Sequence, residues 1–318
     1  MNSSDIQPIP FEQLQQAVFP IIAVAGDAQW HPIGTAFVIA VVAPKTAFLL
    51  TAAHNLHYIA RVDAPHTQRN PIVAPDFHAE PPSQVNLSST YVYAFVRNGP
   101  GGVLAEMIRS WVCNTSDVAL MLMQIRPDDE AEFPYRISLD SRPIREDTPT
   151  MAVGYPHMRA DFTSPPDYEA LDFRVGLGLP FVTRIGKVVS IHPQGFGICR
   201  WPGFRVDASF DSGMSGGPVI DLSGAVPLVR GIVCADMSGQ FEDGTRIEGR
   251  QGFASMLWPA MTINPQITLL GEDGNLLVSE DSRLLDFVRC GVVDDHGQAH
   301  DHVCIHQTTS GLAYHYRE

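Results

Sequence analysis

Three short segments of the chain carry residues that together could perform acyl transfer. Thr51-Ala52-Ala53-His54 supplies a histidine, Thr115-Ser116-Asp117 an aspartate, and Gly213-Met214-Ser215-Gly216-Gly217-Pro218 a serine among glycines. A serine hydroxyl can attack a carbonyl carbon, an imidazole can take and return its proton near neutral pH, and a carboxylate can hold the imidazole in the required tautomer. Glycines beside the serine let backbone N–H groups converge on the oxyanion that forms. The three segments therefore predict a Ser-His-Asp site.

The composition narrows the class of protein that must position these residues. The 318 residues suffice for two packed domains or one large β unit, and 45% hydrophobic with 18% charged residues excludes a disordered chain. A net charge of −14 has the wrong sign for binding phosphates, so nucleic acid is not a predicted partner. Lys45 and Lys187 are the only lysines, and the arginines form no dense cationic run of the kind that binds a membrane surface.

The cysteines and the first residues bear on the compartment. The five cysteines contain no C-x-x-C pair, which argues against a disulfide framework or a zinc ribbon and favours buried free thiols. The segment from Met1 to Leu14 has no basic region followed by an apolar run, so it does not predict a secretory signal. We expect a cytoplasmic protein without a cofactor.

Short apolar runs separated by turn residues dominate the rest of the chain. The longest apolar stretch, Ile33 to Ala53, has the length of a membrane span, but Pro44 and Lys45 divide it into two runs of strand length, so two buried strands joined by a turn are the better interpretation. No amphipathic helix pattern interrupts the strands, which favours antiparallel barrels or sandwiches. Strands are predicted at Val18–Val24, Thr35–Val42, Ala47–Thr51, Tyr91–Val96, Val103–Val112, Val118–Gln124, Phe181–Ile191, Phe196–Trp201, Phe204–Ala208, Pro218–Asp221, Leu228–Ala235 and Gly252–Leu257.

Polar segments divide the chain into four parts. Residues 1–17 are a lead with a predicted helical turn, 18–140 carry His54 and Asp117, 141–261 carry Ser215, and 262–318 form an extension of unknown role. Two insertions, 61–90 and 157–180, are predicted as long surface loops. Within the extension, Leu284–Cys290 fits either a helix or a strand.

The order and context of the three motifs resemble the chymotrypsin-like (trypsin-fold) serine peptidases, whose signatures are T-A-A-H, D-[IV]-A-L and G-x-S-G-G-P. Val206-Asp207-Ala208 and Gly252-Phe253-Ala254 are similar to the HtrA/Deg-type bacterial members. The resemblance covers Val18 to Leu257. It implies an all-β fold of two six-stranded antiparallel β-barrels with few short helices, and a regulated intracellular bacterial endopeptidase that acts on polypeptides through an acyl-enzyme.

The resemblance also implies a role for each site residue. Ser215 is the nucleophile, His54 the general base and then acid, Asp117 the orienting carboxylate, and the N–H groups of Gly213 and Ser215 the oxyanion hole. Two positions depart from the pattern. Met214 replaces the aspartate that pairs with a new N-terminus in zymogen-activated members, so activation by that ion pair is not expected. Cys234 replaces a serine near the triad aspartate, and the thiol is a weaker donor.

The residues expected to form the substrate pocket are Ser209, Phe210, Cys234, Asp236 and Ala254. Ser209 stands where a trypsin-like pocket has an aspartate, and Phe210 is expected to fill the pocket floor, which favours small or medium uncharged side chains. Asp211 and Asp236 complicate this expectation, since either could favour basic groups at neighbouring subsites or be a solvated carboxylate at the rim.

Three alternatives stay open at this point. G-x-S-x-G also fits an α/β-hydrolase esterase, although that fold needs a helix after the serine and Asp then His downstream. A protease fold can also serve as a silent binding module, with a regulatory protein bound through 61–90, 157–180 or the extension. The last segment contains His296, His300, His302, Cys304 and His306, which could bind zinc, but their alternation favours an exposed strand and we predict no metal.

Overall fold

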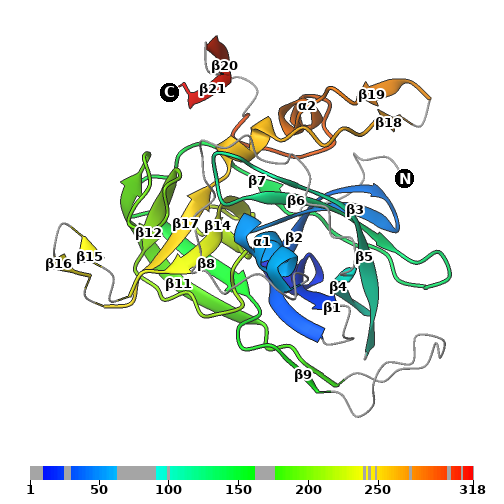
Figure 1. Cartoon of the computed structure of the whole chain (residues 1–318), viewed down its shortest axis with the longest axis horizontal. Coiled ribbons are helices and arrows are strands. Elements are labelled where there is room, and N and C mark those ends of the chain that lie inside the picture. The colour runs from blue at the N-terminus through cyan, green and yellow to red at the C-terminus, as the bar shows by residue number, and fades with distance from the viewer. Residues whose placement is uncertain are drawn as a thin grey trace.

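The structure is a computed structural model that describes residues 10–24, 30–62, 91–98, 101–161, 176–238, 241–242, 245–247, 249–271, 274–298, 302–308 and 311–317. Figure 1 shows two groups of strands side by side, with the last part of the chain lying across both.

The first group is a closed antiparallel barrel with the strand order β1-β2-β3-β6-β5-β4. Val24 pairs with Tyr91, so the first and fourth strands meet and no edge remains open. The strands are β1 (Val18–Val24), β2 (Trp30–Ala43), β3 (Thr46–Thr51), β4 (Tyr91–Asn98), β5 (Gly101–Val112) and β6 (Ala119–Ile125).

The second group is also a closed antiparallel barrel, with the strand order β13-β8-β11-β12-β17-β14. Its first and last strands, β13 and β14, pair with each other and close the barrel. Its strands are β8 (Pro149–Gly154), β11 (Val182–His192), β12 (Gly203–Val206), β13 (Pro218–Asp221), β14 (Leu228–Asp236) and β17 (Gly252–Met256), and the linker strand β7 (Ser138–Leu139) joins β14 in parallel. The prediction of an all-β fold with two six-stranded barrels is confirmed.

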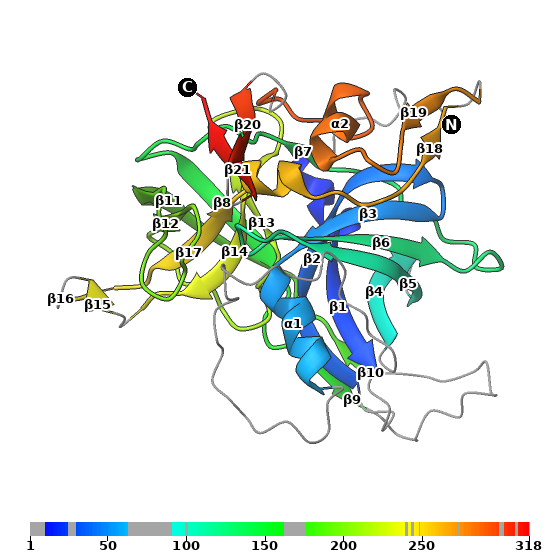
Figure 2. The same cartoon turned by 45° about the horizontal axis from the view of Figure 1, so that its top comes forward.

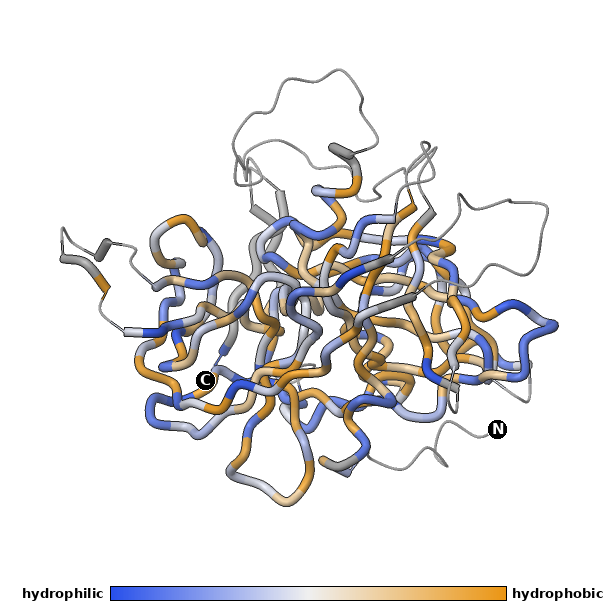
Figure 3. The backbone as a smooth tube through the Cα atoms, turned by 90° about the horizontal axis from the view of Figure 1, so that it is seen from below, coloured by the Kyte–Doolittle hydropathy of each residue, from blue (hydrophilic) through white to orange (hydrophobic). Residues whose placement is uncertain are grey.

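Strands that are buried on both faces explain the long apolar run of the sequence. Along β3, Ala47 and Leu49 point into the first barrel, whereas Phe48 and Leu50 belong to a larger cluster shared with the second barrel and the last part of the chain. Successive side chains of a strand point to opposite faces, so a strand with two buried faces is continuously apolar. In Figure 3 many of the hydrophobic segments of the backbone run through the middle of the molecule.

Four short helices connect the strands in the described part of the chain. They are the 3-10 helices η2 (Phe11–Gln16) and η3 (Trp258–Thr262) and the α-helices α1 (Ala53–Val62) and α2 (Leu284–Arg289). Helix α1 was not predicted, because its ten residues give too short a pattern. It buries Leu56 and Ile59, three residues apart on one face, against the first barrel. No helix among the described residues has the length and apolar character needed to cross a membrane.

The extension packs on the first barrel and on the linker. It comprises the hairpin β18 (Leu269–Leu270) and β19 (Leu276–Val278), helix α2, and the hairpin β20 (Val303–Thr308) and β21 (Gly311–Tyr316). Helix α2 lies on the side of the first barrel that carries β3 (Figure 2). Its Phe287 ring contacts the Phe48 ring of β3 edge to face, with 5.5 Å between the ring centroids. Both rings are fully buried. The extension therefore completes the hydrophobic core.

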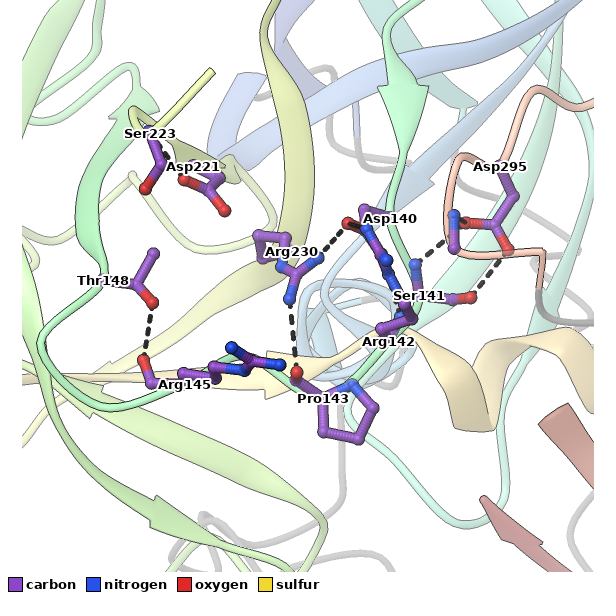
Figure 4. Close-up of polar contacts among 11 residues, drawn as sticks. Asp140, Ser141, Arg142, Pro143, Arg145, Thr148, Asp221, Ser223, Arg230 and Asp295 are labelled. Carbon is purple, nitrogen blue, oxygen red and sulfur yellow. Dashed lines mark hydrogen bonds and ion pairs between the residues drawn. The ribbon is translucent and has the colours of Figure 1, made fainter. Parts of the chain in front are cut away.

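Polar contacts fix the linker between the barrels to both the extension and the second barrel (Figure 4). The Asp295 carboxylate accepts the N–H of Ser141 at 2.9 Å and its hydroxyl at 2.6 Å. Asp140 pairs with Arg230 of β14 and, at 2.6 Å, with Arg142. A linker held from both sides limits movement of one barrel against the other.

Some predicted elements differ from the structure. The strand predicted at Phe196–Trp201 is wrong, because the chain turns there and only an isolated bridge joins Phe196 to Cys199. In the insertions, residues 63–90 and 162–175 lie outside the described residues, while β9 (Arg159–Asp161) pairs with β10 (Gly176–Gly178). A further small hairpin joins β15 (Phe241–Glu242) to β16 (Thr245–Arg246).

Candidate active site

His54 and Asp117 come together at one end of the first barrel. His54 lies in the first turn of α1, directly after β3, and Asp117 lies in the loop between β5 and β6. His54 Nδ1 is 2.6 Å from Asp117 Oδ2, and the His54 backbone N–H donates to Asp117 Oδ1 at 2.9 Å. The two contacts orient the carboxylate and the ring together, which holds the Nδ1–H tautomer and directs Nε2 away from Asp117.

Opposing effects set the pKa of His54. Burial lowers it, but the negative charge of Asp117 and its hydrogen bond to the ring raise it, and the net result is a pKa above the usual 6.5. The Asp117 side chain is only 4% exposed and the His54 side chain 36%, so the carboxylate is shielded from water while one side of the ring remains accessible. An imidazole with a raised pKa is a stronger base, as proton transfer from a serine hydroxyl requires.

The loop that carries Ser215 belongs to the second barrel but rests on the first. The Ser215 carbonyl oxygen accepts the Thr35 N–H at 2.8 Å and the Asn55 side-chain amide at 3.0 Å. Asn55 directly follows His54, so this bond links the backbone of the serine to the helix that carries the histidine. Strand β2 and helix α1 thus place Ser215 beside His54.

In this structure the Ser215 hydroxyl donates to the Cys234 carbonyl oxygen at 3.4 Å. Within the described residues it makes no hydrogen bond to His54. Catalytic hydrogen bonds are often long or misaligned without substrate, and rotation about one side-chain bond redirects a serine hydroxyl.

Two backbone amides of the Ser215 loop are free to bind an oxyanion. Between residues 213 and 217, Met214 N donates to Asp211 O, Gly216 N to Val233 O and Gly217 N to Met214 O, at 3.0, 2.9 and 2.9 Å. The N–H groups of Gly213 and Ser215 have no acceptor among the described residues. The Ser212 carbonyl accepts His157 N–H at 3.1 Å. Because C=O and N–H of a trans peptide point in opposite directions, this bond turns the Gly213 N–H away from His157.

Glycine is required at two positions of this loop. Gly213 has φ +97°, and Gly216 has φ +87°, a backbone region that other residues rarely adopt. A Cβ on Gly216 would lie 2.1 Å from the Thr35 carbonyl oxygen. The glycines therefore allow the loop to approach the first barrel closely.

A cavity of about 420 Å³ opens beside Ser215. It is lined by Phe210, Asp211, Ser212, Ser215, Val233, Cys234, Ala235 and Asp236. Three of the residues predicted for the substrate pocket, Phe210, Cys234 and Asp236, lie in this lining. The other two do not: Ala254 is fully buried in the second-barrel core, and Ser209 is half-buried outside the lining.

Cys234 lies on β14, near Asp117. Burial first, and next the negative charge of Asp117, raise the pKa of the Cys234 thiol well above its usual value. A thiol with this pKa stays protonated, so it is an inert buried group that can donate a hydrogen bond, rather than a reactive thiolate.

A contact between the barrels braces the Asp117 loop. The hydroxyls of Ser116 and Ser255 lie 2.8 Å apart, and both residues are buried. Ser255, on β17, and the supporting residues Thr35 and Asn55 were not identified from the sequence. The adjacency of Asn55 to His54 was the one available signal, since the other contacts join segments far apart in the chain.

Residues 34–227 match the family model of the trypsin-like peptidase domain. The chain belongs to this family, which confirms the resemblance seen in its motifs. The α/β-hydrolase alternative is wrong, since strand β13 rather than a helix follows Ser215.

Many solved structures are similar to the chain, including the following three, and no curated protein matches it. The active form of the Rv3671c protease from M. tuberculosis is 18% identical over 79% of this chain and 85% of that chain, with a TM-score of 0.43. The HtrA-type protease AlgW with a decapeptide is 17% identical over 76% and 61%, with a TM-score of 0.43. The apo MamO protease domain from Magnetospirillum magneticum is 14% identical over 78% and 95%, with a TM-score of 0.44.

Proposed function

We propose that this protein is a serine endopeptidase with Ser215, His54 and Asp117 as its triad. The observation that carries the proposal is the pair of free amide N–H groups, on Gly213 and Ser215, in the loop that α1 and β2 hold beside the His54–Asp117 pair. A binding scaffold needs neither the free amides nor the oriented imidazole.

The reaction follows from these groups. Ser215 Oγ attacks the peptide carbonyl carbon while His54 Nε2 takes its proton, and the N–H groups of Gly213 and Ser215 bind the oxyanion. His54 then protonates the leaving amine, the C–N bond breaks, and an acyl-enzyme remains. Water, deprotonated by His54, attacks the ester carbonyl carbon, the bond from that carbon to Ser215 Oγ breaks, and His54 returns the proton to Oγ, which releases the carboxylic acid and restores Ser215. Asp117 stabilises the imidazolium that forms twice in this cycle.

We also propose that the protease is a regulated intracellular bacterial enzyme that does not depend on N-terminal cleavage. Met214 is fully buried in the second-barrel core, so the position that pairs with a new N-terminus in zymogens is apolar here. The five cysteines are free thiols, as is usual in a reducing compartment. The resting contact of Ser215 with Cys234 is consistent with control by substrate or by a partner protein.

A fluorophosphonate probe tests the proposal, because it phosphonylates only an activated serine. We expect labelling of the wild-type protein and none of Ser215→Ala, together with a loss of peptide hydrolysis by several powers of ten. Ser223→Ala, which changes an exposed serine in the turn after β13, is the matched control and retains full labelling. Absence of labelling in the wild type, with and without peptide substrates, would favour the silent binding module.

A further inference from the structure

The cavity beside Ser215 contains two carboxylates in different electrostatic states. Asp211 forms an ion pair with Arg184 of β11, so its charge is already neutralised. Asp236, at the end of β14, faces no cation among the described residues. Its Oδ1 accepts the N–H of Ser238 at 3.1 Å and the hydroxyl at 2.6 Å.

The second oxygen of Asp236 is therefore available to a ligand. No hydrogen bond or ion pair to Oδ2 occurs within the described part of the chain, and the residue is exposed. The turn to Ser238 holds the carboxylate in place, so little conformational entropy is lost when a cation binds.

The other walls of the cavity suit the stem of a long basic side chain. Phe210 and Val233, both almost fully buried, and the half-buried Ala235 are the apolar residues of the lining. Lysine and arginine bury their methylene groups against apolar surface and direct the charged head toward an acceptor. The net charge of −14 adds a long-range attraction for cationic peptides.

We propose that Asp236 selects polypeptides with lysine or arginine immediately before the cleaved bond, the P1 position. This inference rests on the proposed protease function and names its substrate class. It replaces the expectation of uncharged P1 side chains, which followed from Ser209 and Phe210 alone. The basic group here is recognised from the end of β14 rather than from the base of the pocket.

Matched peptides test the proposal. Norleucine has the four-carbon side chain of lysine without the terminal ammonium group, so the ratio of their kcat/KM values measures what the ammonium group contributes. We expect the wild type to prefer lysine by roughly 10- to 100-fold, as for a hydrogen bond to a charged group. Asp236→Asn keeps the oxygen that binds Ser238 but removes the charge, so the preference should disappear. Asp236→Lys should favour a P1 glutamate.

Asp221→Asn is the control, since Asp221 makes the same turn, to Ser223, at the end of β13 outside the cavity (Figure 4). It should retain the wild-type ratio. Two results would overturn the inference: a wild type that prefers norleucine, or an Asp236→Asn variant with the same kcat/KM ratio as the wild type. If fluorophosphonate still labels Ser215 in that case, the proposed protease function is unaffected. A chain that neither labels nor cleaves any peptide overturns the proposed function, and this inference with it.

Discussion

Replacing Asp117 with asparagine removes the negative charge that contacts the His54 ring while conserving the side-chain shape. The carboxylate accepts two hydrogen bonds from His54, at 2.6 and 2.9 Å, and is 4% exposed, so no bulk water substitutes for it. An asparagine that keeps the backbone bond presents its NH₂ group to Nδ1. The ring must then carry its proton on Nε2, where it cannot accept one from Ser215. We expect kcat to fall about 10⁴-fold, or about 5 kcal/mol in the activation free energy.

The pH dependence of the hydrolysis rate tests the contact between His54 and Asp117 independently. His54 must be neutral to act as a base, so the wild-type rate should rise with pH through a midpoint above 6.5, where its raised pKa lies. In Asp117→Asn the two effects that raise the pKa are gone and burial still lowers it, so the midpoint of the residual rate should fall below 6.5. The charged pair stabilises the wild-type fold fully below pH 6.5, and this contribution is lost as pH rises through the raised pKa.

Initial rates of peptide hydrolysis from mildly acidic to mildly alkaline pH measure both effects, and circular dichroism checks that the variant is folded. Asp221→Asn, far from His54 in sequence and outside the cavity, serves as the control for loss of one carboxylate. A folded Asp117→Asn protein with kcat within tenfold of the wild type, or with an unchanged midpoint, would refute the role given to Asp117.

Three further predictions concern the supports of the site. Ser255→Ala leaves the buried Ser116 hydroxyl without its partner, so it should lower the free energy of unfolding, measured with urea, by about 1–3 kcal/mol and also reduce kcat/KM. An unchanged kcat/KM would show that the contact does not position the Asp117 loop. Gly216→Ala forces a Cβ to 2.1 Å from a carbonyl oxygen of β2 at a positive φ, and should cost at least about 1–3 kcal/mol in thermal unfolding, so an unaltered Tm would contradict the loop geometry. Phe287→Ala should lower the free energy of unfolding by about 3–5 kcal/mol, whereas Leu277→Ala, at a side chain that is 42% exposed, should have little effect; equal losses would mean that α2 is not part of the core.

The barrels could be predicted from the sequence because their strands are marked by local signals. Strands β1 and β13 have the predicted bounds, since turn residues bracket each apolar run. Helix α1 could not be predicted, because its amphipathic pattern is too short to identify in the sequence, and burial of Leu56 and Ile59 against the barrel stabilises the segment.

The candidate active site was also only partly predictable from the sequence. The three residues of the proposed triad lie in recognisable motifs, but the contacts that support them do not. Thr35 and Asn55 hold the Ser215 backbone across a sequence distance that no local pattern spans. The state of Asp211 likewise depends on Arg184, which strand pairing of the second barrel brings near it. Motifs therefore predict chemical groups, whereas their charge state and support depend on the tertiary fold.

The edge-to-face contact between Phe48 and Phe287 also constrains the order of events during synthesis. On the ribosome the first barrel emerges before the second, and domains generally begin to fold as they emerge. The outer face of β3 nevertheless stays without its partner until α2 has been translated. Full stability of the first barrel, and with it a rigid platform for His54, is thus reached only after the second barrel has been made. If synthesis stops before α2 is made, the apolar outer face of β3 remains exposed, and chaperones could bind it.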